Sequence, residues 1–147
     1  MKAISVRQPW AGAILTLGKD VENRSRTLGS YRGTVAVHAS QNPAPATAVA
    51  TVEKITGAPV PFYGAPSAGI AWDFGAIIGV VDLVDVHTYR DCADHHGAPC
   101  SPWAERSGVH LQLARPRVLA RPVPARGQLG LWTVDDITAD IVQRYVR

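Results

Sequence analysis

The chain has 147 residues, of which 46% are hydrophobic and 18% charged, and its net charge is +3. These values exclude global disorder and are typical of one compact domain, which we expect to span residues 1–147. Because no apolar run approaches the roughly 18 residues of a membrane span, and two cysteines make no disulfide framework, we expect a cytoplasmic protein outside any membrane.

The predicted elements are short strands with a few helices inserted. The first helix, over residues 8–17, is predicted from an apolar face with helical spacing, and Gly18 follows as a stop. Strands are expected at residues 3–6, 21–25, 34–39, 76–86, 109–114, 118–123 and 131–134, and further helices at 44–55 and after an acidic cap at 135. Residues 57–69 and 87–108 show no periodicity and are expected to be irregular. Strands without a regular βαβ rhythm favour an α+β fold, a small mixed β-barrel of about six strands with two or three helices.

Three ionisable groups lie within six residues after the first helix: Lys19, Glu22 and Arg24. If the following segment is extended, Glu22 and Arg24 share one face and Asn23 takes the other. Two cations and an anion at a helix-to-strand junction predict a polar ligand site, and a structural ion-pair cluster is the alternative. Exposed ion pairs contribute only about 0–1 kcal/mol, which favours the ligand site.

Five strings of the sequence carry a family resemblance. They are SVRQPWA (5–11), KDVENR (19–24), YRG (31–33), VHAS (37–40) and PVPARGQLGLW (122–132). Together they resemble the ASCH domain family, which is related to PUA domains and shares their small β-barrel. The family signature is Gly-x-Lys-x-x-Glu-x-Arg. Lys19, Glu22 and Arg24 fill its charged positions, whereas Leu17 stands at the glycine position and Gly18 comes one residue later.

The resemblance implies a cleft beside the first helix and the barrel, lined by the signature residues and facing RNA or a nucleotide-like ligand. Lys19 and Arg24 suit phosphate, and Glu22 can accept a hydrogen bond from a base amino group. Trp10 can stack on a base, with a place in the core as the alternative. The remaining candidate ligand-binding residues are Arg7, Gln8, Arg26 and Arg32. Gln8 is equally suited to the cap region of the helix.

The same resemblance suggests a competing class, a small hydrolase. Some small members look like amidohydrolases that deacylate modified cytidine, with a threonine nucleophile where this chain has Glu22. Others are proposed ribonucleases, and Lys19, Glu22 and His38 could share acid–base roles in such a reaction. His38 lies in an apolar strand, where a structural histidine is the alternative. We expect RNA or modified-nucleoside binding without a cofactor. DNA, a protein partner and hydrolysis stay open as alternatives.

The stretch 87–108 contains four metal-ligand types within nine residues: Cys92, His95, His96 and Cys100. Thiolates and imidazoles are zinc ligands, but four ligands this close together would strain one short loop. An ordinary polar loop is the favoured interpretation and a metal site the weaker hypothesis. Residues 101–103, just beyond, are a candidate lid over the cleft.

The basic residues are concentrated towards the two ends of the chain. Residues 1–34 hold six Lys or Arg against two acids, residues 35–114 three against seven, and residues 115–147 six against three. If the fold brings the ends together, they form one basic face of the kind that binds phosphate. The strand arginines Arg115, Arg117 and Arg121 are a candidate nucleic-acid track, with a solvated face as the alternative.

Overall fold

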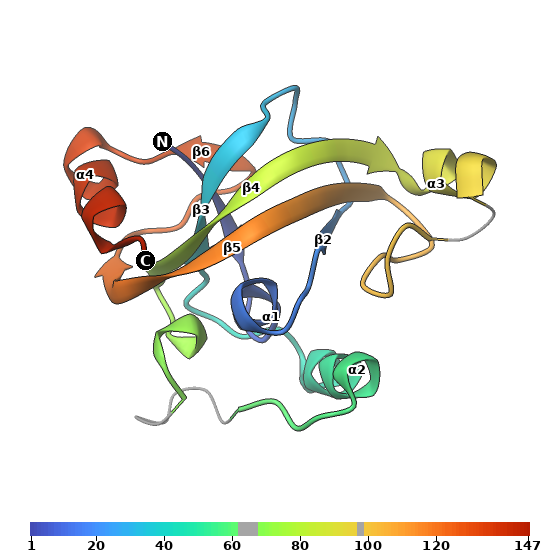
Figure 1. Cartoon of the computed structure of the whole chain (residues 1–147), viewed down its shortest axis with the longest axis horizontal. Coiled ribbons are helices and arrows are strands. Elements are labelled where there is room, and N and C mark those ends of the chain that lie inside the picture. The colour runs from blue at the N-terminus through green and yellow to red at the C-terminus, as the bar shows by residue number, and fades with distance from the viewer. Residues whose placement is uncertain (62–67, 97–98) are drawn as a thin grey trace.

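In a computed structural model of the chain, six strands form one curled, half-open sheet with the order β2-β5-β4-β3-β1-β6 (Figure 1). The structure describes the backbone of residues 1–61, 68–96 and 99–147, and the side chains of these residues except 93–96. The strands are β1 (Lys2–Val6), β2 (Val21–Arg24), β3 (Gly33–Ala39), β4 (Ala76–Thr88), β5 (Val109–Pro124) and β6 (Leu131–Thr133). β1 is parallel to β3, and the other paired neighbours are antiparallel, so the predicted mixed α+β fold is confirmed.

The described residues form four α-helices, where the sequence predicts two or three. They are α1 (Trp10–Thr16), α2 (Ala46–Thr56), α3 (Tyr89–His96) and α4 (Asp136–Tyr145). A short 3-10 helix, η1 (Ile70–Trp72), lies between α2 and β4. α3 lies in the stretch that the sequence predicts to be irregular. The helix was not predicted because its sequence, YRDCADHH, is polar and has no apolar stripe. α4 follows the predicted cap, Asp135, whose side chain accepts from the Thr138 amide. No described helix is both long and apolar enough to cross a membrane.

The middle of the sheet is buried on both faces. α1 covers one face, where Ile14 packs in the same core as Ile78. α4 covers the other, where Val142 packs with Ile77. Neighbouring residues of β4 therefore point into different cores, which explains why residues 76–81 are all buried instead of alternating.

β4 and β5 form a long hairpin whose far end carries α3 (Figure 1). The sequence predicts two strands, 109–114 and 118–123, where the structure has one continuous strand. Arg115 adopts a left-handed φ of 52°, and the pairing register with β4 shifts beside it, so the chain bulges and continues instead of turning. β2 pairs with β5 as far as Gln112, so the missing N–H of Pro116 breaks no ladder to β2.

The first and last strands lie side by side. β1 pairs with β6 through Lys2 and Thr133, and the Val134 amide donates to the Met1 carbonyl. The fold thus brings the N-terminal basic segment close to the C-terminal one, as a shared basic face requires.

Candidate functional site

A cleft of about 600 Å³ opens where the end of β1, the start of α1 and β2 meet. Its wall is built from the signature segment and from two segments distant in sequence, and includes Arg7, Trp10, Glu22, Arg24, Gln41 and Gln128. A second hollow of about 970 Å³ adjoins the cleft, with which it shares Ser5, Ser40 and Leu129 among others. The protein thus has a cleft where the family resemblance implies one.

The signature residues divide between the cleft wall and the interior. Lys19 is 3% exposed, and its ammonium donates to the Val21 carbonyl and lies 3.3 Å from Glu22 Oε2. The same ammonium lies 5.4 Å from the ring centre of Trp10 and 6.0 Å from that of Trp103, in cation–π contact. Lys19 therefore supports the site from within the protein and does not line the cleft. The phosphate-binding role predicted for it has no geometric support in this conformation.

Glu22 joins the two signature cations. Its Oε2 faces Lys19, and its Oε1 lies 3.3 Å from Arg24 Nε. Arg24 Nη2 donates a 2.8 Å hydrogen bond to the Ser5 carbonyl, which ties β2 to the end of β1. Both oxygens of a buried carboxylate in the cleft wall are thus paired with cations, which offsets the cost of burying their charges.

The segment predicted as a lid packs beside the signature and does not line the cleft. Trp103 is buried, and its carbonyl accepts a 2.9 Å hydrogen bond from the Asn23 side chain. Ser101 Oγ donates to Asp20 Oδ1 at 2.5 Å. Asn23 takes no part in the Glu22 ion pairs and instead anchors the 101–103 loop, consistent with the predicted alternation along β2.

Gln8 is fully buried and satisfied within the protein. Its amide group donates to the carbonyls of Ala71 and Asp73 at 2.8 and 3.0 Å, and its oxygen accepts from the Gly12 amide at 2.9 Å. These bonds join the start of α1 to η1 and use the hydrogen-bonding capacity of the side chain. The geometry favours the structural alternative for Gln8 over contact with a ligand.

The predicted arginines lie in different places. Arg7 is exposed and lines the cleft, as does Arg24. Arg26 is exposed in the segment after β2 and is not part of the cleft wall. Arg32 lies 3.9 Å from Asp85 on β4. The cleft therefore has two of the four predicted arginines in its wall.

His38 lies in the adjoining hollow, away from Glu22 and Lys19. It is 2% exposed, and burial lowers its pKa more than the hydrogen bond with the Ala125 carbonyl raises it. The neutral ring donates from Nε2 to that carbonyl at 2.9 Å, and Nδ1 is left without a hydrogen-bond partner. This position does not bring His38 into acid–base partnership with the signature residues.

Two of the three track arginines are paired with Asp82. Arg115 Nε donates to Oδ2 at 2.7 Å and Arg117 Nη2 to Oδ1 at 3.2 Å. The hydrogen bond from Thr34, followed by that from Arg115, lowers the pKa of Asp82. The pairing favours a structural role for these arginines over a free nucleic-acid track.

A second polar cluster lies at the far end of the β4–β5 hairpin. Its members, which we call the hairpin-end cluster, are His87, Cys92, Cys100 and His110, and their donor atoms all lie within 4.8 Å of one another. Cys92 and Cys100 were metal-ligand candidates from the sequence, whereas the side chains of His95 and His96 lie outside the described residues. His87 and His110 were missed because they are 23 positions apart, and only the strand pairing of β4 with β5 makes them direct neighbours.

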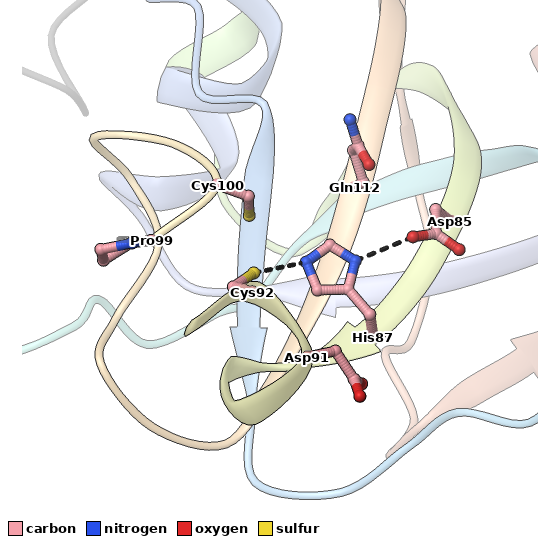
Figure 2. Close-up of a pocket in the computed structure, with 7 residues that line it drawn as sticks. All are labelled: Asp85, His87, Asp91, Cys92, Pro99, Cys100 and Gln112. Atoms are coloured by element: carbon pink, nitrogen blue, oxygen red, sulfur yellow. Dashed lines mark hydrogen bonds and ion pairs between the residues drawn. The ribbon is translucent and has the colours of Figure 1, made fainter. Parts of the chain in front are cut away.

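Three members of the hairpin-end cluster, His87, Cys92 and Cys100, line a cavity of about 590 Å³ (Figure 2). The His87 ring lies between Asp85 and Cys92, and the Cys100 sulfur is turned towards Cys92. Cys100 is exposed as a residue, yet partial burial of its thiol, together with the neighbouring Cys92, raises the pKa of Cys100 to about 11. Of the two clusters, this one has the residue types that could hold a metal.

Comparison with known proteins gives matches at the level of structure. No family model and no curated protein sequence matches the chain. The crystal structure of ASCH from Zymomonas mobilis matches with a TM-score of 0.55 and 14% identity, over 99% of this chain and 95% of that chain. Two mutant forms of the Zymomonas mobilis protein match at TM-scores of 0.55 and 0.52, each with 13% identity and over 99% of this chain, covering 98% and 96% of theirs. The chain therefore has the fold of these ASCH structures, and the predicted resemblance to the ASCH family is confirmed at the level of the fold.

Proposed function

We propose that the cleft binds single-stranded RNA or a modified nucleoside. The observation that carries this proposal is the Glu22 carboxylate, which is held between two cations in the wall of a cleft that also contains an exposed arginine and a half-buried tryptophan. A fixed carboxylate can accept a hydrogen bond from the amino group of a base, and a fixed orientation improves discrimination between bases.

The other residues of the wall supply the remaining contacts of a nucleotide. Arg7 is exposed, lines the cleft and suits a phosphate, for which a guanidinium offers paired donors. Trp10 is half-buried, lines the cleft and has the Lys19 ammonium 5.4 Å from its ring centre, and an aromatic side chain at such a place suits stacking of a base. Gln41 and Gln128, which also line the cleft, add amide groups that can donate and accept.

The geometry supports binding more than hydrolysis. Lys19 is buried and does not line the cleft, and His38 lies in the adjoining hollow, so neither is placed to share acid–base roles with Glu22 in the cleft. A hydrolase would need a base or nucleophile free to approach the reacting atom. We therefore place hydrolysis of acylated cytidine or of RNA second.

The proposal predicts that Arg7→Ala weakens binding of a fluorescently labelled single-stranded RNA and reduces its salt dependence. Loss of one phosphate contact lowers the slope of log affinity against log salt by about 0.7 for a single strand. Fluorescence anisotropy at several salt concentrations measures both quantities. A deoxy strand of the same sequence separates RNA from DNA binding.

Arg144→Ala is the matched control, because Arg144 is an exposed arginine on α4 that is not part of the cleft wall. It should leave affinity and salt slope unchanged. Equal losses of affinity in both variants would show that net charge, and not the cleft, causes the effect. Absence of RNA or nucleoside binding by the parent protein would reject the proposal. Acetate released from N4-acetylcytidine, or cleavage of the labelled RNA, would replace it with the hydrolase.

A further inference from the structure

The hairpin-end cluster gathers four donors from four segments of the chain. His87 lies near the end of β4, Cys92 in α3, Cys100 in the loop after α3, and His110 at the start of β5. Cys92 Sγ lies 2.8 Å from His87 Nε2 and 3.3 Å from His110 Nδ1. Cys100 Sγ lies 3.6 Å from the same His110 nitrogen. Segments far apart in sequence thus direct two sulfurs and two nitrogens towards one small volume.

Hydrogen bonds on the outer side of each imidazole determine which nitrogen faces the cluster. His87 Nδ1 lies 2.8 Å from Asp85 Oδ2, and His110 Nε2 lies 2.7 Å from the Glu105 carbonyl. Because an ionised carboxylate and a carbonyl can only accept, each of these two nitrogens carries the proton. The lone pairs then lie on His87 Nε2 and His110 Nδ1, which are the nitrogens that face the sulfurs. Carboxylates and backbone carbonyls are the usual outer partners of metal-binding histidines.

We propose that His87, Cys92, Cys100 and His110 bind one Zn²⁺ ion in a tetrahedral site. Zinc–sulfur bonds of about 2.3 Å and zinc–nitrogen bonds of about 2.0–2.1 Å place ligand atoms about 3.3–3.8 Å apart at tetrahedral angles. The two contacts of His110 Nδ1, at 3.3 and 3.6 Å, fall in this range, and the contact of His87 with Cys92 is somewhat shorter. The remaining donor pairs lie within 4.8 Å, so closing the four donors onto the ion shortens any one separation by about 1.5 Å at most.

Charge and donor type favour zinc over harder cations. Binding displaces the two thiol protons to solvent, so two thiolates balance the ion and the site is neutral overall. Neutrality matters because Cys92 is 2% and His110 0% exposed, and an unbalanced charge at such a depth is costly. Two thiolates and two imidazoles suit Zn²⁺, whereas Mg²⁺ and Ca²⁺ prefer oxygen ligands. Four protein ligands leave no open position, so the ion holds α3 and its following loop to the hairpin as a structural metal.

Two other uses of these atoms account for fewer of them. Asp85, His87 and Cys92 are arranged like an activated thiol nucleophile beside the cavity, but Cys92 is only 2% exposed. That use also gives no role to Cys100 or to the inward nitrogen of His110. A disulfide between the two cysteines would not account for the two imidazole nitrogens that face the sulfurs. The zinc site uses all four donors and both outer hydrogen bonds.

The test is the metal content and spectrum of the full, tag-free chain. We expect one zinc per chain by inductively coupled plasma mass spectrometry. Replacement by Co²⁺ should give the intense visible bands of tetrahedral cobalt together with a thiolate-to-cobalt charge-transfer band. Cys100→Ser, a change at an exposed residue that the fold should tolerate, should lower zinc affinity about tenfold or more in a chelator competition. The cobalt spectrum uses the unaltered chain and so decides the proposal even if a variant fails to fold.

The matched control is the His95→Ala/His96→Ala double variant, which removes two histidines of the same stretch and should retain the zinc. Loss of metal in this control would overturn the proposed ligand set. Absence of bound zinc with a Cys92–Cys100 disulfide, found by mass spectrometry of the non-reduced chain, would overturn the site. Absence of zinc together with rapid, selective alkylation of Cys92 would overturn the zinc site and would favour Cys92 as an activated thiol nucleophile. An octahedral cobalt spectrum would also reject it.

Discussion

The cleft and the hairpin-end cluster bury polar groups in opposite ways. In the cleft, Glu22 is an anion between two cations, and the three groups come from six consecutive residues. At the hairpin end, every member is an electron-pair donor, and the four members come from positions 87 to 110. In the first group the anion is paired within the group itself, with one cation in excess. The second is balanced once a cation binds.

This difference separates what each region needs in order to be stable. An internally paired cluster is damaged when its central charge is removed, because a partner charge is left buried and unpaired. A cluster of metal ligands is destabilised when its cation is removed, and substitution of one ligand lowers stability mainly because the metal is lost. Charge removal in the cleft and metal loss at the hairpin end should therefore have distinct, separable effects.

The largest expected effect is from Glu22→Gln. The change leaves the ammonium of Lys19, 3% exposed, without its anion. Breaking a buried pair costs about 3–5 kcal/mol, and we expect about 3 kcal/mol because the amide keeps some hydrogen bonding. Urea unfolding measures this as a lower midpoint with an unchanged m-value.

A second substitution sharpens this prediction. Adding Lys19→Met to Glu22→Gln removes the stranded cation and should recover part of the lost stability, because apolar replacement of a buried pair is often close to neutral. The exposed Glu105→Gln serves as the control and should change stability by about 0.5 kcal/mol or less. If Glu22→Gln has as small an effect as the control, the stability of the cleft cluster does not depend on its internal ion pairs and the comparison fails.

The next effect concerns the outer partner of the zinc site. Asp85→Asn removes the carboxylate that orients His87, and loss of such a partner lowers metal affinity about 10–100-fold. Competition against a zinc chelator measures the change, with the exposed Asp140→Asn on α4 as the control. RNA affinity should stay unchanged in Asp85→Asn. Unchanged zinc affinity would mean that the Asp85–His87 bond does not serve a metal.

Most of the strands and three of the helices could be predicted from local patterns, whereas the position of the cleft was implied by the family resemblance. The apolar spacing of α1 and the alternation around Glu22 are each contained in a few consecutive residues, so they are readable without a structure. The separation of the signature into a buried Lys19 and cleft-lining Glu22 and Arg24 could not be predicted from the sequence. Spacing puts Lys19 beside Glu22, but only the packing of Trp10 and Trp103 shows that Lys19 faces inward.

The hairpin-end cluster could be predicted only in part, because its assembly depends on pairing over a long sequence distance. The two cysteines are close enough in sequence to be recognised as candidate ligands, whereas His87 and His110 become neighbours only through the register of β4 with β5. α3 escaped prediction for a related reason. A polar eight-residue helix has no apolar stripe, and its placement at the hairpin end, with Cys92 buried there, is a tertiary property.

A third polar cluster separates the effect of burial from the effect of composition. Asp82 is also a carboxylate between two cations, Arg115 and Arg117, yet the Arg115 side chain is 70% exposed. Its charge pattern matches that of the Glu22 cluster, and the two carboxylates are similarly buried, while its cations have greater contact with solvent. If burial makes the Glu22 cluster sensitive to charge removal, Asp82 should be much less so.

We expect Asp82→Asn to cost up to about 1 kcal/mol at neutral pH, the value of an exposed ion pair. The pKa of Asp82 is lowered in the folded protein by Thr34 and Arg115, so its contribution is present above the ordinary value of 3.8 and is lost as pH falls through the lower folded-state pKa. Thermal unfolding between pH 6 and pH 3 should thus show a shallower acid decline in Asp82→Asn than in the parent, the two curves converging at the acid end. Thr34→Val, which removes the first of these hydrogen bonds but keeps the carboxylate, should give an intermediate slope. A loss at neutral pH as large as that of Glu22→Gln would show that the number of charges, and not their burial, sets the cost.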